Sequence, residues 1–261
     1  MRTIAAVKTG RKTAQTGLEA RPEEPLYRQV QQQMLQCLAG GEWKPGEQLP
    51  TESQLAERFG VAVFTIRAGI GELVASGILL RRQGKGTFVA RHGRQRRRYQ
   101  FSHLFSKAGE RILPERELLS FEKEAADDEA AEALRLPRED RRNIYRVACL
   151  LTVDGRPAAT LDIAVPIAKF AGLSARAIRD GTENLYAVYQ DTCGINVVRI
   201  DERIHAAIAG TATARALKIA PGAPVLRVVR IAYTYNDTPV EYRVRYFIGD
   251  AYCYHWSEGG I

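Results

Sequence analysis

The chain has 261 residues, of which 45% are hydrophobic and 26% are charged. This composition is typical of globular proteins and excludes a chain that is disordered throughout. No run approaches the roughly 18 apolar residues of a membrane-spanning helix, and the N-terminus lacks a signal-peptide pattern. We therefore expect a soluble, cytoplasmic protein without a membrane partner. The four cysteines form no Cys-x-x-Cys pair, so we expect reduced thiols and no metal site.

The positive charge is concentrated in the first third of the chain. Residues 1–98 contain 17 lysines and arginines against 8 acidic residues, whereas residues 99–261 contain 21 against 22. The imbalance remains without residues 1–20, which we interpret as a disordered leader. Such asymmetry indicates a basic module that binds a polyanion, joined to a near-neutral module with another task.

Residues 21–90 are predicted to form one domain that begins with two helices. Apolar residues recur at three- and four-residue spacings from Pro25 until Gly40-Gly41 ends the run. Thr51 is a candidate N-cap for the second helix, and Gln54 stands at the position that completes a capping box.

A third helix is predicted over residues 62–76, followed by two short strands at 78–82 and 87–90 with a glycine-rich tip between them. This order of elements is typical of a winged helix-turn-helix domain. Its third helix fits the major groove of duplex DNA, and its hairpin reaches the neighbouring groove or backbone. We expect Arg67 on the helix and Lys85 at the tip to contact DNA.

Three sequence blocks resemble the GntR family of bacterial transcription regulators. They are PGEQLPTESQLAERFG at residues 45–60, TIR at 65–67 and QGKGTFV at 83–89. The resemblance implies a double-stranded DNA operator as the partner. The residues expected to bind it are Thr51, Glu52, Ser53, Val63, Thr65, Arg67, Gly84, Lys85 and Gly86.

The third helix departs from the family pattern VSRxTVRxAL at its start. Ala62 replaces the polar cap, and Val63 replaces an arginine that contacts a base. Losing a bidentate arginine removes about 1–3 kcal/mol of base discrimination. Either Val63 contacts a thymine methyl group and the operator is altered, which we favour, or specificity is weaker and binding depends on phosphate contacts.

Residues 91–98, with the sequence RHGRQRRR, have no hydrophobic period and are predicted to form a basic linker. Two interpretations stay open for this segment. It is either a solvated connection between two domains or an extended segment that lies along DNA phosphates and adds salt-dependent affinity.

Residues 99–261 are predicted to form an α+β domain with a mostly antiparallel sheet. The expected strands are 144–153, 158–165, 197–206, 224–235 and 239–248, and the expected helices are 122–134, 182–192 and 211–219. Asp154-Gly155 and Asn236-Asp237 are typical hairpin turns. The complete fold class is α+β with two domains, the N-terminal one a winged helix-turn-helix.

Four short motifs in this region resemble the UTRA effector-binding domain of the HutC subfamily, whose fold is like that of chorismate lyase. They are DGRP at 154–157, NLY at 184–186, AxxLxIxPGxPVL at 214–226 and PVEY at 239–242. The resemblance implies a small-molecule effector. Its expected contacts are Cys149, Leu151, Asn184, Tyr186, Glu241 and Phe247.

Family members that bind phosphorylated sugars carry two arginines at the positions of Cys149 and Leu151. This chain lacks that pair of guanidinium groups, so we expect an effector that is not a sugar phosphate. Arg243 and Arg245 share one face of their strand, opposite Tyr242, because side chains alternate along a strand. We favour an exposed face, and the alternative that this face lines a pocket stays open.

No motif indicates catalysis, a nucleotide cofactor or a metal: HExxH, GxSxG and a Walker loop are absent. The acidic run at residues 127–129 is interpreted as a solvated helix face. We expect a ligand-responsive transcription regulator, with repression favoured over activation, that binds two half-sites as a homodimer in the bacterial nucleoid. Two alternatives stay open, a DNA-binding protein whose second domain only dimerises and, more remotely, a lyase-like enzyme.

Overall fold

The computed structural model describes residues 24–91, 103–181, 184–249 and 252–255. These residues divide into two compact units, one formed mainly by the chain up to Val89 and the other mainly by the chain from Ala90. The predicted leader and nearly all of the predicted linker lie outside the described residues. None of the described helices is long and apolar enough to cross a bilayer.

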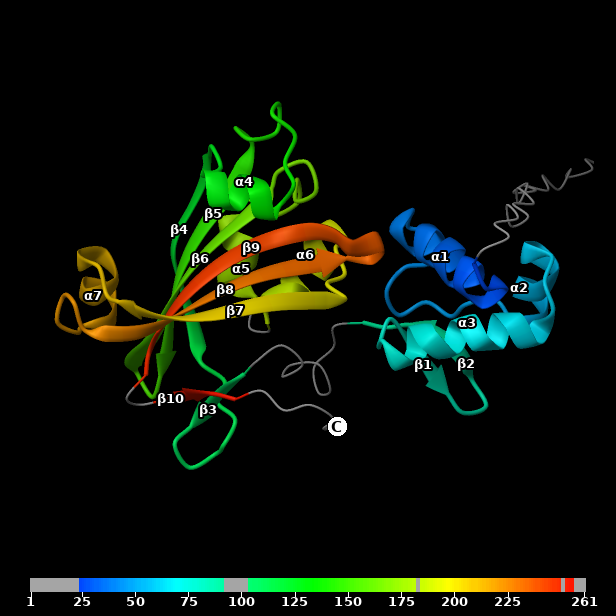
Figure 1. The fold of residues 1–261 in the computed structure, drawn as a ribbon, viewed down its shortest axis with the longest axis horizontal. Helices are drawn as coiled ribbons and strands as arrows, with labels where there is room; N and C mark the ends of the chain where they lie inside the picture. The colour runs from blue at the N-terminus through cyan, green and yellow to red at the C-terminus, as the bar shows by residue number, and fades with distance from the viewer. Residues whose placement is uncertain (1–23, 92–102, 182–183, 250–251, 256–261) are drawn as a thin grey trace, which may run out of the picture. The chain divides into compact units, whose positions relative to one another are not determined.

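The N-terminal unit is a winged helix-turn-helix, as the sequence predicts (Figure 1). Its elements are α1 (Leu26–Ala39), α2 (Glu52–Phe59), α3 (Val63–Ala75), β1 (Leu79–Arg82) and β2 (Gly86–Val89). The two strands pair antiparallel. Each boundary falls within one or two residues of the expected position, because glycines and a capping box mark the helix ends.

The helices of this unit pack through the apolar stripes that the sequence periodicity predicts. Val30 and Met34 of α1 and Ile66 and Ile70 of α3 are almost completely buried. Gly69 of α3 lies against α1, where an added Cβ would stand only 3.0 Å from Val30 Cγ1. The absence of a side chain at Gly69 therefore permits the close crossing of α1 and α3, which offsets the low helix propensity of glycine.

The C-terminal unit is built on a six-stranded antiparallel sheet with the order β4-β5-β6-β9-β8-β7 (Figure 1). The strands are β4 (Glu115–Glu124), β5 (Ile144–Val153), β6 (Arg156–Pro166), β7 (Arg199–Ile208), β8 (Pro224–Thr234) and β9 (Thr238–Ile248). A second, two-stranded sheet joins β3 (Leu104–Ser106) to β10 (Tyr252–Tyr254). These sheets confirm the predicted α+β class.

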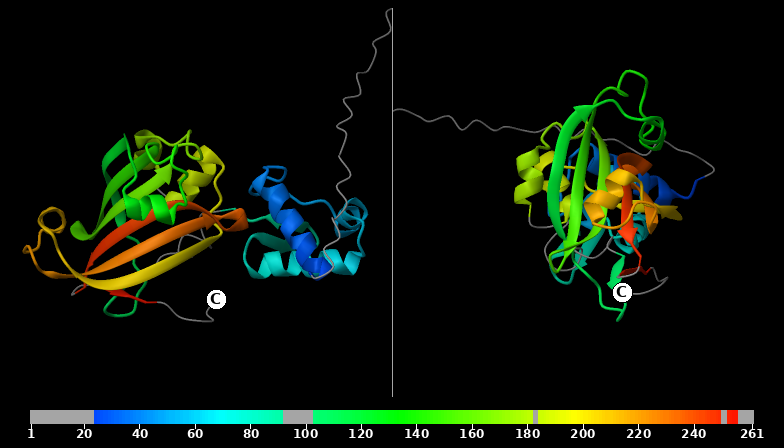
Figure 2. Two further views of the ribbon diagram at one scale, coloured as in Figure 1. Left: turned by 45° about the horizontal axis from the view of Figure 1, so that its top comes forward. Right: turned by 90° about the vertical axis from the view of Figure 1, so that its left-hand side faces the viewer.

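Helices cover both faces of the large sheet (Figure 2). The inner face is the face of the sheet that packs against α5 (Ala175–Asp180) and α6 (Leu185–Cys193). Side chains of these helices and of this face form one hydrophobic core. The outer face packs against α4 (Asp128–Ala133) and α7 (Thr211–Leu217). The short 3-10 turn η1 (Tyr235–Asp237) connects β8 to β9.

One predicted helix of this unit is wrong. Residues 122–134 do not form a single helix, because β4 extends to Glu124 and α4 begins only at Asp128. The Asp127 carboxylate caps α4 by accepting from the Ala130 N–H at 2.7 Å. The charged residues of β4 belong to an edge strand with one exposed face, and a bulge at Leu119 interrupts their alternation.

Further differences concern the start of one predicted helix and two sets of elements that the sequence did not predict. The helix expected at 182–192 is α6, which begins at Leu185 with Asn184 as its N-cap. The helix α5 and the small sheet of β3 and β10 were not predicted. These elements are six residues long or shorter, so they carry little periodicity.

Candidate functional site

The start of α2 is fixed by a complete capping box. Thr51 Oγ1 accepts a hydrogen bond from the Gln54 N–H at 3.3 Å, and Gln54 Oε1 accepts from the Thr51 N–H at 2.9 Å. The exposed Ser53 lies in the first turn. As at any helix start, the first backbone N–H groups have no acceptor within the helix, so this end of α2 suits a phosphate.

The side chain of Glu52 joins the third helix to the hairpin. Its Oε2 accepts from Arg67 Nε of α3 at 2.9 Å, and its Oε1 accepts from Arg81 Nη2 of β1 at 2.8 Å. Both arginine side chains remain about half exposed or more. One carboxylate therefore orients two arginines that still reach solvent. The sequence placed Glu52 and Arg67 at the site but missed Arg81.

Two apolar side chains stand exposed at the start of α3. Val63 is 37% exposed and Phe64 is 78% exposed, whereas Thr65 is half-buried. Ala62 supplies no side-chain cap, as the sequence predicts. Sequence reasoning missed Phe64, although an aromatic residue outside the buried stripe of the helix was the available indication. The start of α3 therefore offers an apolar surface.

The hairpin tip is held by a hydrogen bond from the Gln48 side chain to its backbone and carries the exposed Lys85. Gln48 Nε2 donates to the Lys85 carbonyl at 2.8 Å. Gly84 and Gly86 have positive φ angles of 69° and 102°, and a Cβ on Gly86 would stand 2.7 Å from Gln48 Nε2. Glycine is required there so that the tip can pack against the segment before α2, which leaves the Lys85 side chain exposed.

A buried polar cluster lies on the inner face of the large sheet. Glu241 of β9 is completely buried and accepts hydrogen bonds from Tyr186 at 3.2 Å, from Tyr189 at 2.7 Å and from Arg243 at 2.6 Å. Burial, reinforced by the carboxylate of Glu241, raises the pKa of Tyr189 well above its ordinary value. Both hydroxyls therefore remain protonated donors at neutral pH.

The expectation that Arg243 and Arg245 are exposed is wrong. They are only 6% and 8% exposed, and Arg230 of β8 is 2% exposed. The alternation along β9 is as predicted, but the face that carries these arginines is the one that packs against α6. The sequence pattern identified the shared face without identifying what covers it.

The expected effector contacts gather on this inner face, with one exception. Cys149, Leu151, Tyr186 and Phe247 belong to one buried hydrophobic cluster. Asn184 instead uses its side chain as a helix cap, because its Oδ1 accepts from the Ala187 N–H at 3.0 Å. Burial also raises the pKa of the Cys149 thiol, so this side chain stays neutral and adds a weakly polar surface to the inner face.

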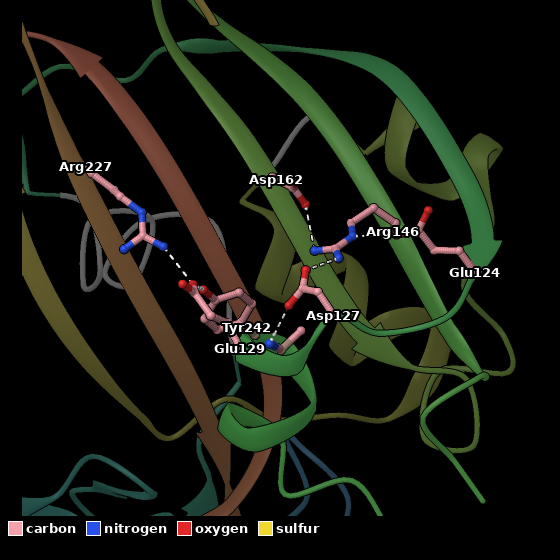
Figure 3. Close-up of polar contacts among 8 residues, drawn as sticks. Glu124, Asp127, Glu129, Arg146, Asp162, Arg227 and Tyr242 are labelled. Atoms are coloured by element: carbon pink, nitrogen blue, oxygen red, sulfur yellow. Dashed lines mark hydrogen bonds and ion pairs between the residues drawn. The ribbon is translucent and has the colours of Figure 1, made fainter. Parts of the chain in front are cut away.

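Ion pairs connect α4 to the outer face (Figure 3). Arg146 of β5 contacts Asp127 at 2.5 Å, Glu124 at 2.8 Å and Asp162 at 3.1 Å. The acidic run at residues 127–129 is exposed, as expected, but it is not merely a solvated face. Asp127 and Glu129 both pair with arginines of the sheet. Within the described residues, no group of three or more metal-ligating side chains occurs.

Two family models match the chain: the model described as bacterial regulatory proteins, gntR family, at residues 26–89, and the UTRA domain at residues 110–253. The second match covers more than half of the chain. The first coincides with the winged helix-turn-helix, and the second coincides with the large sheet and its covering helices.

Individual proteins show the same similarity. The chain is 29% identical over 230 residues to the mannosyl-D-glycerate transport/metabolism system repressor MngR of Escherichia coli, covering 88% of this chain and 94% of that one. It is 34% identical over 119 residues to the histidine utilization repressor of Pseudomonas putida, covering 45% and 48%. The crystal structure of the ligand-binding domain of a GntR-family regulator from Bordetella bronchiseptica matches 64% of this chain and all of that one, with 29% identity and a TM-score of 0.57.

Proposed function

The chain belongs to the gntR family of bacterial regulatory proteins and carries the UTRA domain of its HutC subfamily, and from this premise we propose that it is a repressor that releases its operator when a metabolite binds the C-terminal unit. Two proteins that the chain resembles are named repressors. The protein is therefore a DNA-binding transcription regulator rather than an enzyme, and its UTRA domain responds to a small molecule.

The observation that carries the proposal is the exposed surface formed by α2, α3 and the hairpin. It combines the start of a helix that suits phosphates, the arginines oriented by Glu52 and the lysine at the tip. We assign Thr51, Ser53 and Lys85 to the DNA backbone, where such contacts set the register without selecting sequence.

The start of α3 would then meet the bases. Val63, Phe64 and Thr65 lie in its first turn, and apolar side chains recognise the methyl group of thymine in the major groove. This assignment favours an altered operator, rich in A·T pairs, over a general loss of specificity. Arg67, held by Glu52, is the remaining candidate for a guanine contact.

The effector site is assigned to the inner face of the large sheet, around Tyr186, Glu241 and Phe247. Buried charged and hydrogen-bonding groups occur there beside apolar walls, which is typical of small-molecule sites. Cys149 and Leu151 offer no guanidinium group, so we retain the proposal that the effector is not a sugar phosphate. The Oδ1 atom of Asn184 is occupied by the helix cap, so its side-chain amide group is the part that could donate to an effector.

We further propose a homodimer that acts in the cytoplasm on a palindromic operator. A two-fold symmetric protein reads two half-sites, which doubles the contact surface that one small winged domain supplies. Effector binding changes operator affinity only if the effector prefers the arrangement that does not fit DNA.

The proposal is tested with the purified protein and DNA from its own promoter at low ionic strength. We expect a mobility shift on a palindromic segment that exceeds binding to a shuffled sequence of equal composition, and release by one of a panel of metabolites. Binding that no metabolite changes would favour the ligand-independent alternative. Equal binding to both DNAs would contradict sequence-specific regulation.

A further inference from the structure

Three arginine side chains are buried side by side on the inner face. Arg230 of β8 stands directly opposite Arg243 of β9 in the strand register, and Arg245 follows two residues later on the same face. They are 2%, 6% and 8% exposed. Burying a guanidinium group is unfavourable unless an anion and hydrogen-bond acceptors replace the lost water.

Two of the three arginines have a counter-charge. Arg230 Nε donates to Glu202 Oε1 at 2.5 Å, and Arg243 Nη2 donates to Glu241 Oε2 at 2.6 Å. Arg245 forms no hydrogen bond and no ion pair with any residue that the structure describes, and its Nε is a buried donor without an acceptor. Among these three guanidinium groups, only that of Arg245 has neither a carboxylate nor a hydrogen-bond acceptor within the described part of the chain. Arg116 of β4, which also lies on the inner face, donates instead to the carbonyls of Ile178 and Gly181.

The apolar surroundings of Arg245 make its unpaired charge unfavourable unless an anion lies beside it. Leu161 and Val228 flank it on the neighbouring strands, and its Cζ lies 5.1 Å from the centre of the Phe247 ring. Burial, followed by the nearby charges of Arg230 and Arg243, lowers the pKa of Arg245 to about 9. The group is still protonated at neutral pH, so it remains a charge in an apolar setting.

A second donor without a partner lies close to the same ring. The Tyr254 hydroxyl of β10 is buried and has no hydrogen-bond partner among the described residues. Its ring packs edge-on against Phe247, with the centroids 6.1 Å apart. Phe247 is therefore bordered by two buried polar groups, one cationic and one hydroxyl, that both lack an acceptor. Native proteins leave few such groups unsatisfied, so the two donors indicate a site that suits a hydrogen-bond acceptor.

We propose that Arg245 holds a carboxylate group of the effector, with the Tyr254 hydroxyl as a second donor. This assignment rests on the proposed function, which places the effector on the inner face. It adds to that proposal the chemical class of the effector, a carboxylate. The single guanidinium group of Arg245 matches one carboxylate group. The planar guanidinium group suits a carboxylate through two parallel N–H···O bonds.

The test uses the full-length protein and three variants: Arg245→Met, Tyr254→Phe and the control Arg227→Met. Arg227 lies on β8 but faces outward, where it pairs with Glu129, so the control removes the same charge from the other face. The urea midpoint of each protein is followed while sodium acetate, or sodium phosphate in a second series, replaces sodium chloride at constant ionic strength.

We expect acetate to raise the midpoint of the wild type and of Arg227→Met to a plateau, because a ligand that binds only the folded state stabilises it. Arg245→Met should lose at least tenfold in apparent acetate affinity, and Tyr254→Phe should lose a smaller factor. In chloride alone, Arg245→Met should unfold at a midpoint equal to or above that of the wild type, because the substitution removes an unpaired buried charge.

Three results would overturn the assignment: no plateau with acetate for the wild type, an unchanged acetate response in Arg245→Met, or a midpoint of Arg245→Met well below the wild type in chloride, which would show a structural role. Saturable stabilisation by phosphate alone would overturn the carboxylate class. Promoter binding by the wild type and by Arg227→Met is measured separately, so its failure would count against the proposed function instead.

Discussion

Tyr242 of β9 donates a hydrogen bond of 2.6 Å to Glu129 of α4, a residue 113 positions earlier in the chain. The same carboxylate oxygen accepts from Arg227 of β8 at 2.8 Å, so Glu129 ties the short helix to two strands (Figure 3). A six-residue helix has little stability of its own, because helix nucleation is unfavourable. These contacts, with the buried Ala130, therefore fix α4 on the outer face.

Tyr242→Phe should lower the free energy of unfolding at pH 7 by about 1 kcal/mol, the usual contribution of one hydrogen bond, because the exposure of Glu129 to solvent screens its charge. The Tyr242 hydroxyl is the main cause that lowers the pKa of Glu129. A lowered pKa in the folded state stabilises the protein above the unfolded pKa of about 4.5, and this stabilisation is lost as the pH falls.

The variant should therefore lose less stability than the wild type between pH 5 and about pH 3.5, as measured by urea unfolding. Tyr145→Phe is the matched control, since Tyr145 lies on β5 of the same sheet and its hydroxyl forms no hydrogen bond with the described residues. Parallel acid profiles for the wild type and Tyr242→Phe would show that the hydrogen bond does not shift the titration of Glu129.

Glu52→Gln should weaken sequence discrimination while leaving overall DNA affinity intact or higher. The substitution removes a negative charge near the DNA surface, but it also releases Arg67 and Arg81 from their common carboxylate. We expect the ratio of operator affinity to shuffled-DNA affinity to fall about tenfold, which corresponds to one disordered base contact. Glu57→Gln removes the same charge from an exposed position on α2. Equal ratios in both variants would contradict a positioning role for Glu52.

Val63→Arg and Phe64→Ala probe the apolar start of α3. In Val63→Arg, the new arginine should shift the preferred operator toward guanine at one position and increase the salt slope by about 1 if the side chain reaches a phosphate. An unchanged salt slope and sequence preference in Val63→Arg would show that this position does not face DNA.

Phe64→Ala removes the exposed ring and should weaken operator binding by about 1 kcal/mol, with Leu26→Ala on α1 as an exposed apolar control.

The N-terminal unit was predictable because its determinants are local. Thr51 and Gln54 form the capping box within four residues, and Gly60 ends the helix with a left-handed backbone at φ 70°. The ion pairs of Glu52 with Arg67 and Arg81 were not predictable in full, because they join residues that only the tertiary fold brings together. Local sequence chemistry thus defines elements better than it defines contacts between them.

The inner face illustrates the same limit more strongly. The alternation of β9 correctly placed Arg243 and Arg245 on one side, but it carries no information about what covers that side. The cover comes from α6, and the carboxylate opposite Arg230 comes from Glu202 on the edge strand β7. A buried arginine and an exposed one have the same sequence pattern, and only the distant partners distinguish them.

Glu241→Met should lower the free energy of unfolding by about 3–5 kcal/mol, because it leaves Arg243 as a buried charge without its carboxylate. The double variant Glu241→Met/Arg243→Met removes both charges and should recover at least about 1 kcal/mol of this loss, although Tyr189 still lacks its acceptor. Urea unfolding of the wild type, both single variants and the double variant gives the coupling energy directly. Strict additivity of the two single effects would show that Glu241 and Arg243 do not compensate each other, and the charge balance inferred for the inner face would then fail.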